Sequence, residues 1–369
     1  RAASTEIVSA VADSGVVAAL ESARTITGSL NSLADLGNTL RTNADRSIAS
    51  GVDRVNAALE EIEVLNSRVA RATDNSATEA TLRDERGRLL DEISQFLPIE
   101  TAEREGGRID VMTKEGVFLL AGEAKTLSFQ GSPIVPADAS LENGELSGLS
   151  VDGAEITPGT ASYAAIGSGE LAALFAVRDQ DVAEVMQQID IVAADLMARF
   201  AGEVTDPDAP AGSAGLFIDS GNESSVGLAG RIAVNPAVDP EAGGAVWRLR
   251  DGFSASAPGP VGDGARLKAM LEGLTTPRAV AGSDAAGVLS AVDLVADISS
   301  SIGQTRVQQD ATLASVTAQH DAFSNAEIAE TGVDIDVELQ ELLLIEQAYA
   351  ANARVIEVAD RMINRLMDI

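Results

Sequence analysis

The chain has 369 residues, enough for two or three domains with a hydrophobic core. Its formal net charge is -31, from 57 acidic residues against 26 lysines and arginines, which argues against a nucleic-acid partner because such a partner needs a basic surface. The absence of cysteine excludes thiolate metal sites and cysteine nucleophiles, and histidine chemistry would rest on His320 alone. We therefore expect no enzymatic activity and no metal or other cofactor.

The first predicted element is a helical segment over residues 4–72. Its apolar residues recur at alternating steps of four and three, the pattern of a helix that packs lengthwise against another helix. Gly28, Gly37 and Gly51 interrupt this segment, and we expect bends or breaks there because glycine weakens a helix interior by about 1 kcal/mol relative to alanine. The residues predicted to pack this rod are Ile48, Val52, Val55, Leu59, Ile62 and Val69, with Asn66 as a polar member of the stripe.

A second helix is predicted over residues 81–97, where Pro98 ends it, so that residues 1–97 form the N-terminal part of a helical rod. Beyond Pro98 the period changes. Short apolar stretches alternate with glycine-containing turns, as they do in antiparallel hairpins. We therefore predict a β-rich module at residues 98–165.

Helix returns at residues 166–202, where apolar residues again follow heptad spacing. Residues 203–290 combine short strands, turns and a short helix, and predict a mixed lobe of β-structure and loop. Residues 291–369 are predicted to form the C-terminal part of the rod. The resulting fold class is α+β: an elongated helical bundle built from both chain ends, with β-rich lobes inserted in the middle.

The most regular apolar pattern lies in the last predicted helix, residues 334–369. Steps of three and four alternate along it, with one asparagine that would fix the register of a partner helix. A stripe this apolar on so acidic a chain indicates an interface that awaits a partner. The predicted C-terminal seam consists of Leu342, Ile345, Tyr349, Asn352, Ile356, Ala359, Ile363 and Leu366.

Two local motifs suggest chemistry but have simpler structural explanations. Residues 167–172 fit the glycine fingerprint of dinucleotide-binding folds, yet the acidic residue that should follow, Asp190, lies in the same helix rather than after a second strand. The carboxylates of residues 334–338 lack the glycine and glutamate that a calcium-binding loop needs further on. Instead, an aspartate here can cap the N-terminus of the last helix, and the carboxylates stabilise the positive end of its dipole.

The predicted C-terminal helix carries TGVDIDVEL at 331–339 and EQAYAANARVI at 346–356. These stretches resemble the C-terminal signature of the flagellar hook-associated protein 1 (FlgK) family. Three further stretches agree with it in the expected order: LRDERGRLLDE at 82–92, GELAAL at 169–174 with Arg178 and Asp179 following, and GLF at 215–217.

This resemblance implies a structural junction protein of the bacterial flagellum, which joins the hook to the filament and lies outside the cell. It implies secretion by type III export and assembly by heterologous packing of subunits. The implied partners are the hook protein, the second junction protein, other copies of the chain, and an export chaperone that would use the C-terminal seam before assembly. Members of the family begin with a further N-terminal arm, whose motif does not occur here; that arm would pair with the C-terminal helix.

The residues leave other classes open. A secreted adhesin or surface protein could combine a helical stalk with β-rich binding lobes, and an enzyme could use the β-rich middle as its catalytic domain. Within flagella, the second junction protein and the hook protein are the nearest alternatives, and residues 82–92 favour the first junction protein over both. The net negative charge leads us to expect no nucleic-acid binding. We also expect no membrane insertion, because no apolar run reaches the roughly 18 residues that a membrane-spanning helix needs.

Overall fold

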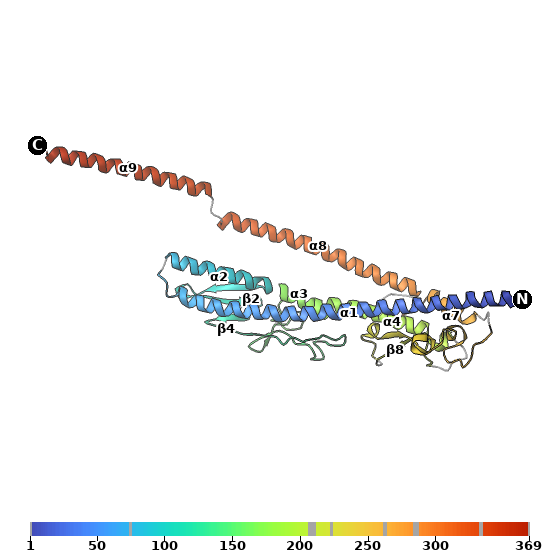
Figure 1. Ribbon diagram of the computed structural model, residues 1–369. Coiled ribbons are helices and arrows are strands. Elements are labelled where there is room, and N and C mark those ends of the chain that lie inside the picture. The colour runs from blue at the N-terminus through green and yellow to red at the C-terminus, as the bar shows by residue number, and fades with distance from the viewer. Residues whose placement is uncertain are drawn as a thin grey trace. The chain divides into compact units, whose positions relative to one another are not determined.

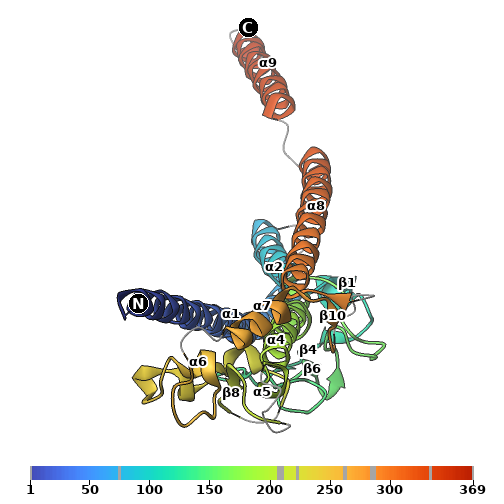
Figure 2. The same ribbon diagram turned by 90° about the vertical axis from the view of Figure 1, so that its right-hand side faces the viewer.

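The computed structural model describes residues 2–73, 76–205, 212–221, 224–260, 264–282, 288–331 and 335–367; the side chains of residues 2–13, 330–338 and 358–367 lie outside this description. The chain divides into two compact units, Arg1–Ser299 and Ser300–Ile369. In sequence order, long helices form both ends of the chain, and the small antiparallel sheets come from its middle part (Figures 1 and 2). The predicted α+β class is therefore confirmed.

The first unit is organised around α1, Ala2–Val69, a helix of 68 residues. The helix runs without interruption through all three glycines, so the predicted break is wrong. Close packing explains two of them: a Cβ atom at Gly37 would lie 2.8 Å from the side chain of Met186, and one at Gly51 would lie 3.1 Å from Phe96. Glycine at these positions lets neighbouring elements approach the helix backbone. At Gly28 nothing lies within 4 Å.

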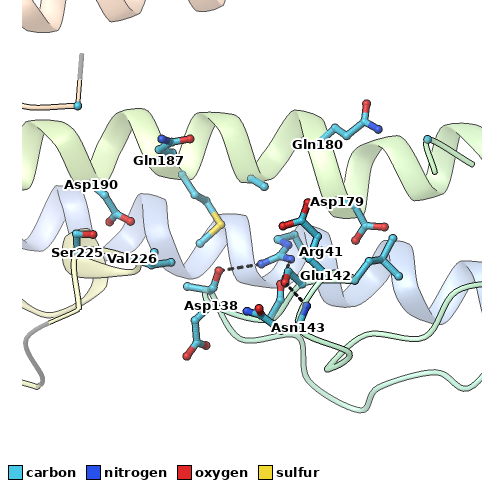
Figure 3. Close-up of a pocket in the computed structure, with 18 of the residues that line it drawn as sticks. Arg41, Asp138, Glu142, Asn143, Asp179, Gln180, Gln187, Asp190, Ser225 and Val226 are labelled. Carbon is cyan, nitrogen blue, oxygen red and sulfur yellow. Dashed lines mark hydrogen bonds between the residues drawn. The ribbon is translucent and has the colours of Figure 1, made fainter. Parts of the chain in front are cut away.

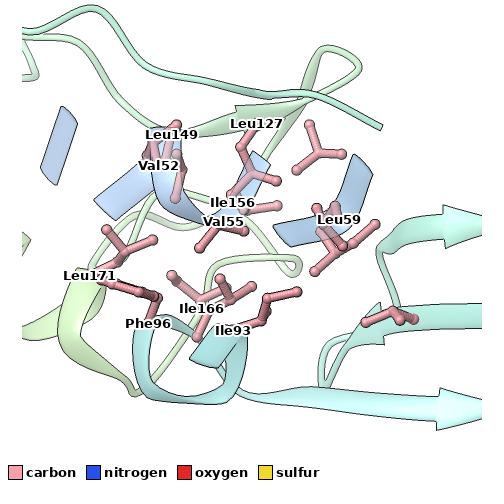
Figure 4. Close-up of a cluster of buried hydrophobic side chains, with 14 of the residues drawn as sticks. Val52, Val55, Leu59, Ile93, Phe96, Leu127, Leu149, Ile156, Ile166 and Leu171 are labelled. Atoms are coloured by element: carbon pink, nitrogen blue, oxygen red, sulfur yellow. The ribbon is translucent and has the colours of Figure 1, made fainter. Parts of the chain in front are cut away.

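The predicted rod stripe is buried along α1. Its six apolar side chains are at most 4% exposed, and all but Val69 belong to one core cluster (Figure 4). The second helix, α2, spans Ala77–Phe96 and contributes Ile93 and Phe96 to the same cluster. Ser76 caps α2 by accepting a hydrogen bond from the backbone N–H of Glu79.

The polar member of the stripe, Asn66, holds a sheet and a helix together. Its Oδ1 accepts hydrogen bonds from the backbone N–H of Ile109 and from the guanidinium of Arg86, at 3.1 and 3.0 Å, and its Nδ2 donates to the Ile109 carbonyl at 2.8 Å. Arg86 also donates to the carbonyl of Gly107. Asn66 therefore fixes where the first sheet meets α1, since a buried amide requires these partners.

Two small antiparallel sheets follow α2. The first is a four-stranded meander in the order β1-β2-β3-β4, and in it Ile99 pairs with Thr113 and Glu103 with Ile109. The second has the order β5-β6-β7. Their inward side chains, such as Val111, join the core of α1 and α2. The strands are β1 Ile99–Glu103, β2 Ile109–Thr113, β3 Phe118–Ala121, β4 Glu123–Ala124, β5 Leu127–Ser128, β6 Ser150–Val151 and β7 Ala154–Glu155.

The helical run after the sheets has three parts: α3 Glu170–Ala176, a π-helical turn at Val177–Asp181, and α4 Val182–Arg199. It lies antiparallel to α1, because Arg41 donates to the Arg178 carbonyl while Gly37, earlier in α1, faces Met186, later in α4. The π turn shifts the helical register locally. The Arg178 side chain lies in this turn and is completely buried.

The elements between Gly202 and Leu289 form a second lobe. This lobe packs on the N-terminal half of α1 (Figure 1). Its core includes Phe200 and Phe217, whose rings meet edge to face at a centroid distance of 5.2 Å. Arg199 donates to the carbonyls of Gly273, Thr276 and Leu289, and so ties the loops of the lobe to α4. The elements are α5 Gly202–Thr205, β8 Phe217–Asp219, β9 Ile232–Val234, α6 Arg248–Asp251, α7 Ala265–Thr275, β10 Arg278–Ala279 and β11 Val288–Leu289, with short 3-10 turns at Leu228–Gly230, Pro236–Val238 and Pro240–Ala242.

Two long helices complete the chain, α8 at Ala291–Thr331 and α9 at Ile335–Met367. The start of α8 belongs to the first unit, where the hydroxyl of Ser290 accepts from the backbone N–H of Asp293. The rest of α8 and all of α9 make up the second unit. The segments predicted at residues 1–97, 98–165, 166–202 and 203–290 thus share one compact unit.

We predict that Gly169→Ala destabilises the first unit by about 1–3 kcal/mol. Gly169 has a φ of 94°, and a Cβ atom there would lie 2.5 Å from the carbonyl oxygen of Phe96, which is backbone and cannot turn away. Urea unfolding followed by circular dichroism measures the change.

Gly87→Ala is the matched control, because nothing lies within 4 Å of that position in α2. It should stabilise the chain by roughly 0.5–1 kcal/mol through helix propensity. Equal midpoints for Gly169→Ala and the original chain would contradict the steric argument.

Candidate assembly surface

A cavity of about 1170 Å³ lies in the first unit beside α4 (Figure 3). Arg41 and Asp190 are prominent in its lining, but each is held by backbone of this chain. Arg41 donates to the carbonyls of Pro136, Ala137 and Ala139, and the carboxylate of Asp190 accepts from the backbone N–H groups of Gly227 and Ala229 at 2.7 Å. Arg41 therefore connects the loop at residues 136–139 to α1. Asp190 connects the turn at residues 227–229 to α4.

Burial governs the electrostatics of this cavity. Desolvation lowers the pKa of Arg41, and it raises the pKa of Asp190 even though two backbone N–H groups stabilise the carboxylate. Both side chains lie between the elements that they join. Their polar groups thus serve the packing of the unit, and the geometry suggests no nucleophile or acid–base pair among them.

Beside the cavity, a fully buried ion pair joins α1 to the π turn. Arg178 and Asp45 are 0% and 1% exposed, and Nη1 of Arg178 lies 2.6 Å from Oδ1 of Asp45. The guanidinium lies 4.7 Å from the ring centre of Phe175 and 5.7 Å from that of Phe129. Asp45 also accepts from the backbone N–H of Ser132. The family-like stretch around Arg178 therefore has a structural explanation in this unit.

Other kinds of site find no support in the described part of the chain. No group of three or more histidine, aspartate or glutamate side chains is arranged there to hold a metal ion. His320 is exposed on α8, with Nδ1 3.6 Å from a carboxylate oxygen of Asp321. Among the same described residues, no helix has the length and apolar character required to cross a membrane.

The predicted C-terminal seam lies on α9 and is exposed. Leu342, Ile345, Tyr349 and Ile356 are between 62% and 78% exposed, and Asn352 is exposed as well. Ala359, Ile363 and Leu366 belong to the same helix, but their side chains lie outside the described residues. No described side chain of the second unit is buried. An apolar surface of this extent on a water-exposed helix is typical of a protein interface.

Sequence reasoning missed further exposed apolar residues. On α9, Leu343, Leu344 and Val355 lie outside the predicted seam and are between 55% and 67% exposed. On α8, the large exposed apolar residues are Val292, Val295, Ile302, Val307, Leu313, Val316, Phe323 and Ile328. The run of four aliphatic residues at 342–345 was the available signal on α9, because such a run cannot fit within one seam.

The family-like stretches separate into two groups. Each stretch in the first unit contributes buried side chains, namely Arg86, Leu171, Arg178, Leu216 and Phe217. They are explained by packing within the unit. The stretch on α9 has no such explanation, because its apolar residues contact no core within the described part of the second unit. The α9 helix is thus the candidate assembly surface.

Comparison with known proteins agrees with this division. A family model for the helical domain of the flagellar hook-associated protein FlgK matches residues 14–202, just over half of the 369 residues. By this match the chain belongs to the FlgK family of flagellar hook-associated proteins. A second model, for the C-terminal region of the flagellar basal body rod proteins FlgEFG, matches residues 328–369.

A solved structure of the flagellar hook junction protein FlgK from Burkholderia pseudomallei is similar to part of the chain. It is 20% identical, with a TM-score of 0.45. The similarity covers 58% of this chain, which spans 38% of the length of that structure. The search of curated proteins gave no match.

We predict that Asp45→Ala destabilises the first unit by about 1–3 kcal/mol, because the buried guanidinium of Arg178 loses one of its two carboxylate partners and keeps only Asp179. Chemical denaturation of the purified chain gives the loss. Asp53→Ala is the control, since Asp53 is an exposed residue of the same helix and should change stability little. If both variants unfolded at the same denaturant concentration, the buried ion pair would have no net structural role.

Proposed function

We propose that the chain is a structural subunit of the junction between hook and filament in the bacterial flagellum. Membership of the FlgK family gives it a structural role in the flagellum. The finer assignment is supported by the sequence signatures at residues 82–92 and 331–362 and by the exposed apolar surface of α9. That surface is the observation that carries the proposal, because an axial subunit must bury such a helix in its neighbours.

The two units would then have different tasks. The first unit, with its long α1 and two lobes held by buried polar contacts, forms a rigid body before assembly. The second unit carries the C-terminal seam, which becomes buried when a subunit joins the tube. A tube of identical subunits needs heterologous contacts, in which one face of each subunit meets a different face of the next. The partners that we propose are the hook protein, the second junction protein and other copies of this chain.

Before assembly, the same seam would bind a flagellar export chaperone. Type III export passes chains in an unfolded state, and the absence of cysteine suits such a route because no disulfide has to form or open. A chaperone on the α9 seam would also keep the exposed apolar residues from aggregating. The seam would therefore act twice, first with the chaperone and then in the tube wall, outside the cell.

We predict that Ile356→Asp weakens binding of the export chaperone more than tenfold. Burying an isoleucine side chain is worth about 1.5–3 kcal/mol, and an aspartate would add the cost of a buried charge. Titration calorimetry or a pull-down with the purified chaperone measures the loss.

Gln347→Asp introduces the same charge on the polar side of α9 and serves as the control. It should bind the chaperone as the original chain does. Chaperone binding by Ile356→Asp that equals that of the control would refute this role of the seam.

The position in the flagellum has its own test. Immunogold labelling of cells with an antibody to this chain should mark one narrow zone where the hook meets the filament. Label spread over the cell surface would instead support the adhesin alternative.

A further inference from the structure

The cavity beside α4 extends along one side of that helix (Figure 3). Residues at steps of three and four along the helical run line it, namely Gln180, Ala183, Met186, Gln187, Ile191 and Ala194. At 1.5 Å per residue, this span is about 21 Å long. The volume of about 1170 Å³ exceeds the roughly 300–1,000 Å³ of a typical small-molecule site. The space therefore suits a segment of polypeptide better than a small ligand.

The walls of the cavity are fixed by contacts within the first unit. The loop at residues 137–143 is held by Arg41, and it has a small core of its own in which Ala139 packs with Val135 and Leu146. Another part of the wall, residues 225–226, directly precedes the turn at residues 227–229 that Asp190 holds. A site whose walls are already fixed loses little conformational entropy when it binds a ligand.

The lining combines apolar and amide side chains, as an extended peptide requires. Leu141 and Ile191 supply apolar surface, and both are half-buried. Asn143, Gln180 and Gln187 are exposed, and each amide offers both donors and an acceptor. The backbone groups of an extended chain need such partners, whereas those of a helix are already paired with one another. An extended segment about 21 Å long contains six or seven residues at roughly 3.3 Å each.

The charge of the lining is negative. Asp138 and Glu142 are exposed on the loop, and Asp179 lies in the π turn, where it is paired with Arg178. Among the described residues that line the cavity, Arg41 is the only cation, and it is buried and donates to backbone carbonyls. A lysine or arginine of a bound segment would therefore meet Asp138 and Glu142 without an exposed cation to repel it.

We propose that this cavity binds an extended, basic peptide segment of a partner protein, with lysine or arginine side chains beside Asp138 and Glu142 and small apolar side chains against α4. Alternate residues of an extended chain point to opposite sides, so both kinds of contact form at once. The site belongs to the first unit and uses no residue of α9. The inference therefore goes beyond the proposed function and does not rest on it.

A labelled peptide tests the site. The probe is a fluorescein-labelled heptapeptide in which lysine alternates with alanine or valine, and fluorescence anisotropy at physiological salt measures its binding to the full chain. We expect saturable one-to-one binding, at least tenfold tighter than that of the same peptide with glutamate in place of lysine. Equal binding of the two peptides, or no saturable binding of the lysine peptide, would overturn the proposal.

A double variant, Asp138→Lys with Glu142→Lys, reverses the charge of the loop and should weaken binding of the lysine peptide at least tenfold. The matched control is Glu123→Lys with Glu155→Lys, which changes the net charge equally at two exposed positions outside the lining of the cavity. The control should bind the peptide as the original chain does, apart from a small effect of net charge that salt screens. If both double variants lost the same affinity, binding would follow net charge alone and the site would be refuted.

A third variant, Ala183→Leu, adds volume to the lining without changing charge, and leucine favours helix nearly as well as alanine. It should weaken the lysine peptide at least fivefold while the circular dichroism spectrum stays the same. Ala173→Leu is its control, because Ala173 is exposed on α3 and lies outside the lining. Equal peptide affinities of these two variants would contradict the proposed position of the peptide. The chaperone test of Ile356→Asp concerns α9, so its failure leaves this result unaffected.

Discussion

The lengthwise burial of one face of α1 is the constraint on which the first unit depends. A single helix of 68 residues cannot be stable through helix propensity alone in its glycine-containing parts, and its stability comes from the elements packed along it. The core cluster from Ile48 to Ile62 joins it to α2 and both small sheets, and a second cluster, with Leu20 and Leu30, joins it to α4 and the second lobe. Both lobes therefore pack against the same helix, α1.

Buried arginines fix the distances and orientations between packed elements, which small aliphatic side chains cannot do because their contacts are not directional. In a chain of net charge -31, Arg41, Arg86, Arg178 and Arg199 are all buried and donate mainly to backbone carbonyls or to a buried carboxylate. The planar guanidinium has five donors in fixed directions, so each of these contacts specifies both distance and orientation. Their removal would leave carbonyl groups without partners in the core. The acidic surplus remains largely at the surface, where it favours solubility.

The second unit follows the opposite principle. Its described apolar side chains lie in water, both along α9 and at scattered positions on α8. Such a helix gains most of its stabilising free energy only when other helices cover it, so folding and assembly are linked. A compact first unit and a C-terminal helix that lacks a core suit the proposed role of a subunit that becomes fixed only when it joins its neighbours. The FlgK family is consistent with that use.

Periodicity in the sequence determined the helices, the α+β class and the apolar faces, because the spacing of apolar residues depends only on the local geometry of the chain. It also located the seam on α9, whose described apolar side chains are exposed. It could not show that Gly37 and Gly51 continue a helix, because the close approach of Met186 and Phe96 arises only when distant segments meet. For the same reason it did not reveal that Asn66 binds a strand or that Arg178 is paired with Asp45, 133 residues away in sequence. The sequence indicated that the stripe on α9 is an interface, but only the tertiary structure decided which elements bury the similar stripe on α1, since burial depends on what packs against a helix and not on the helix itself.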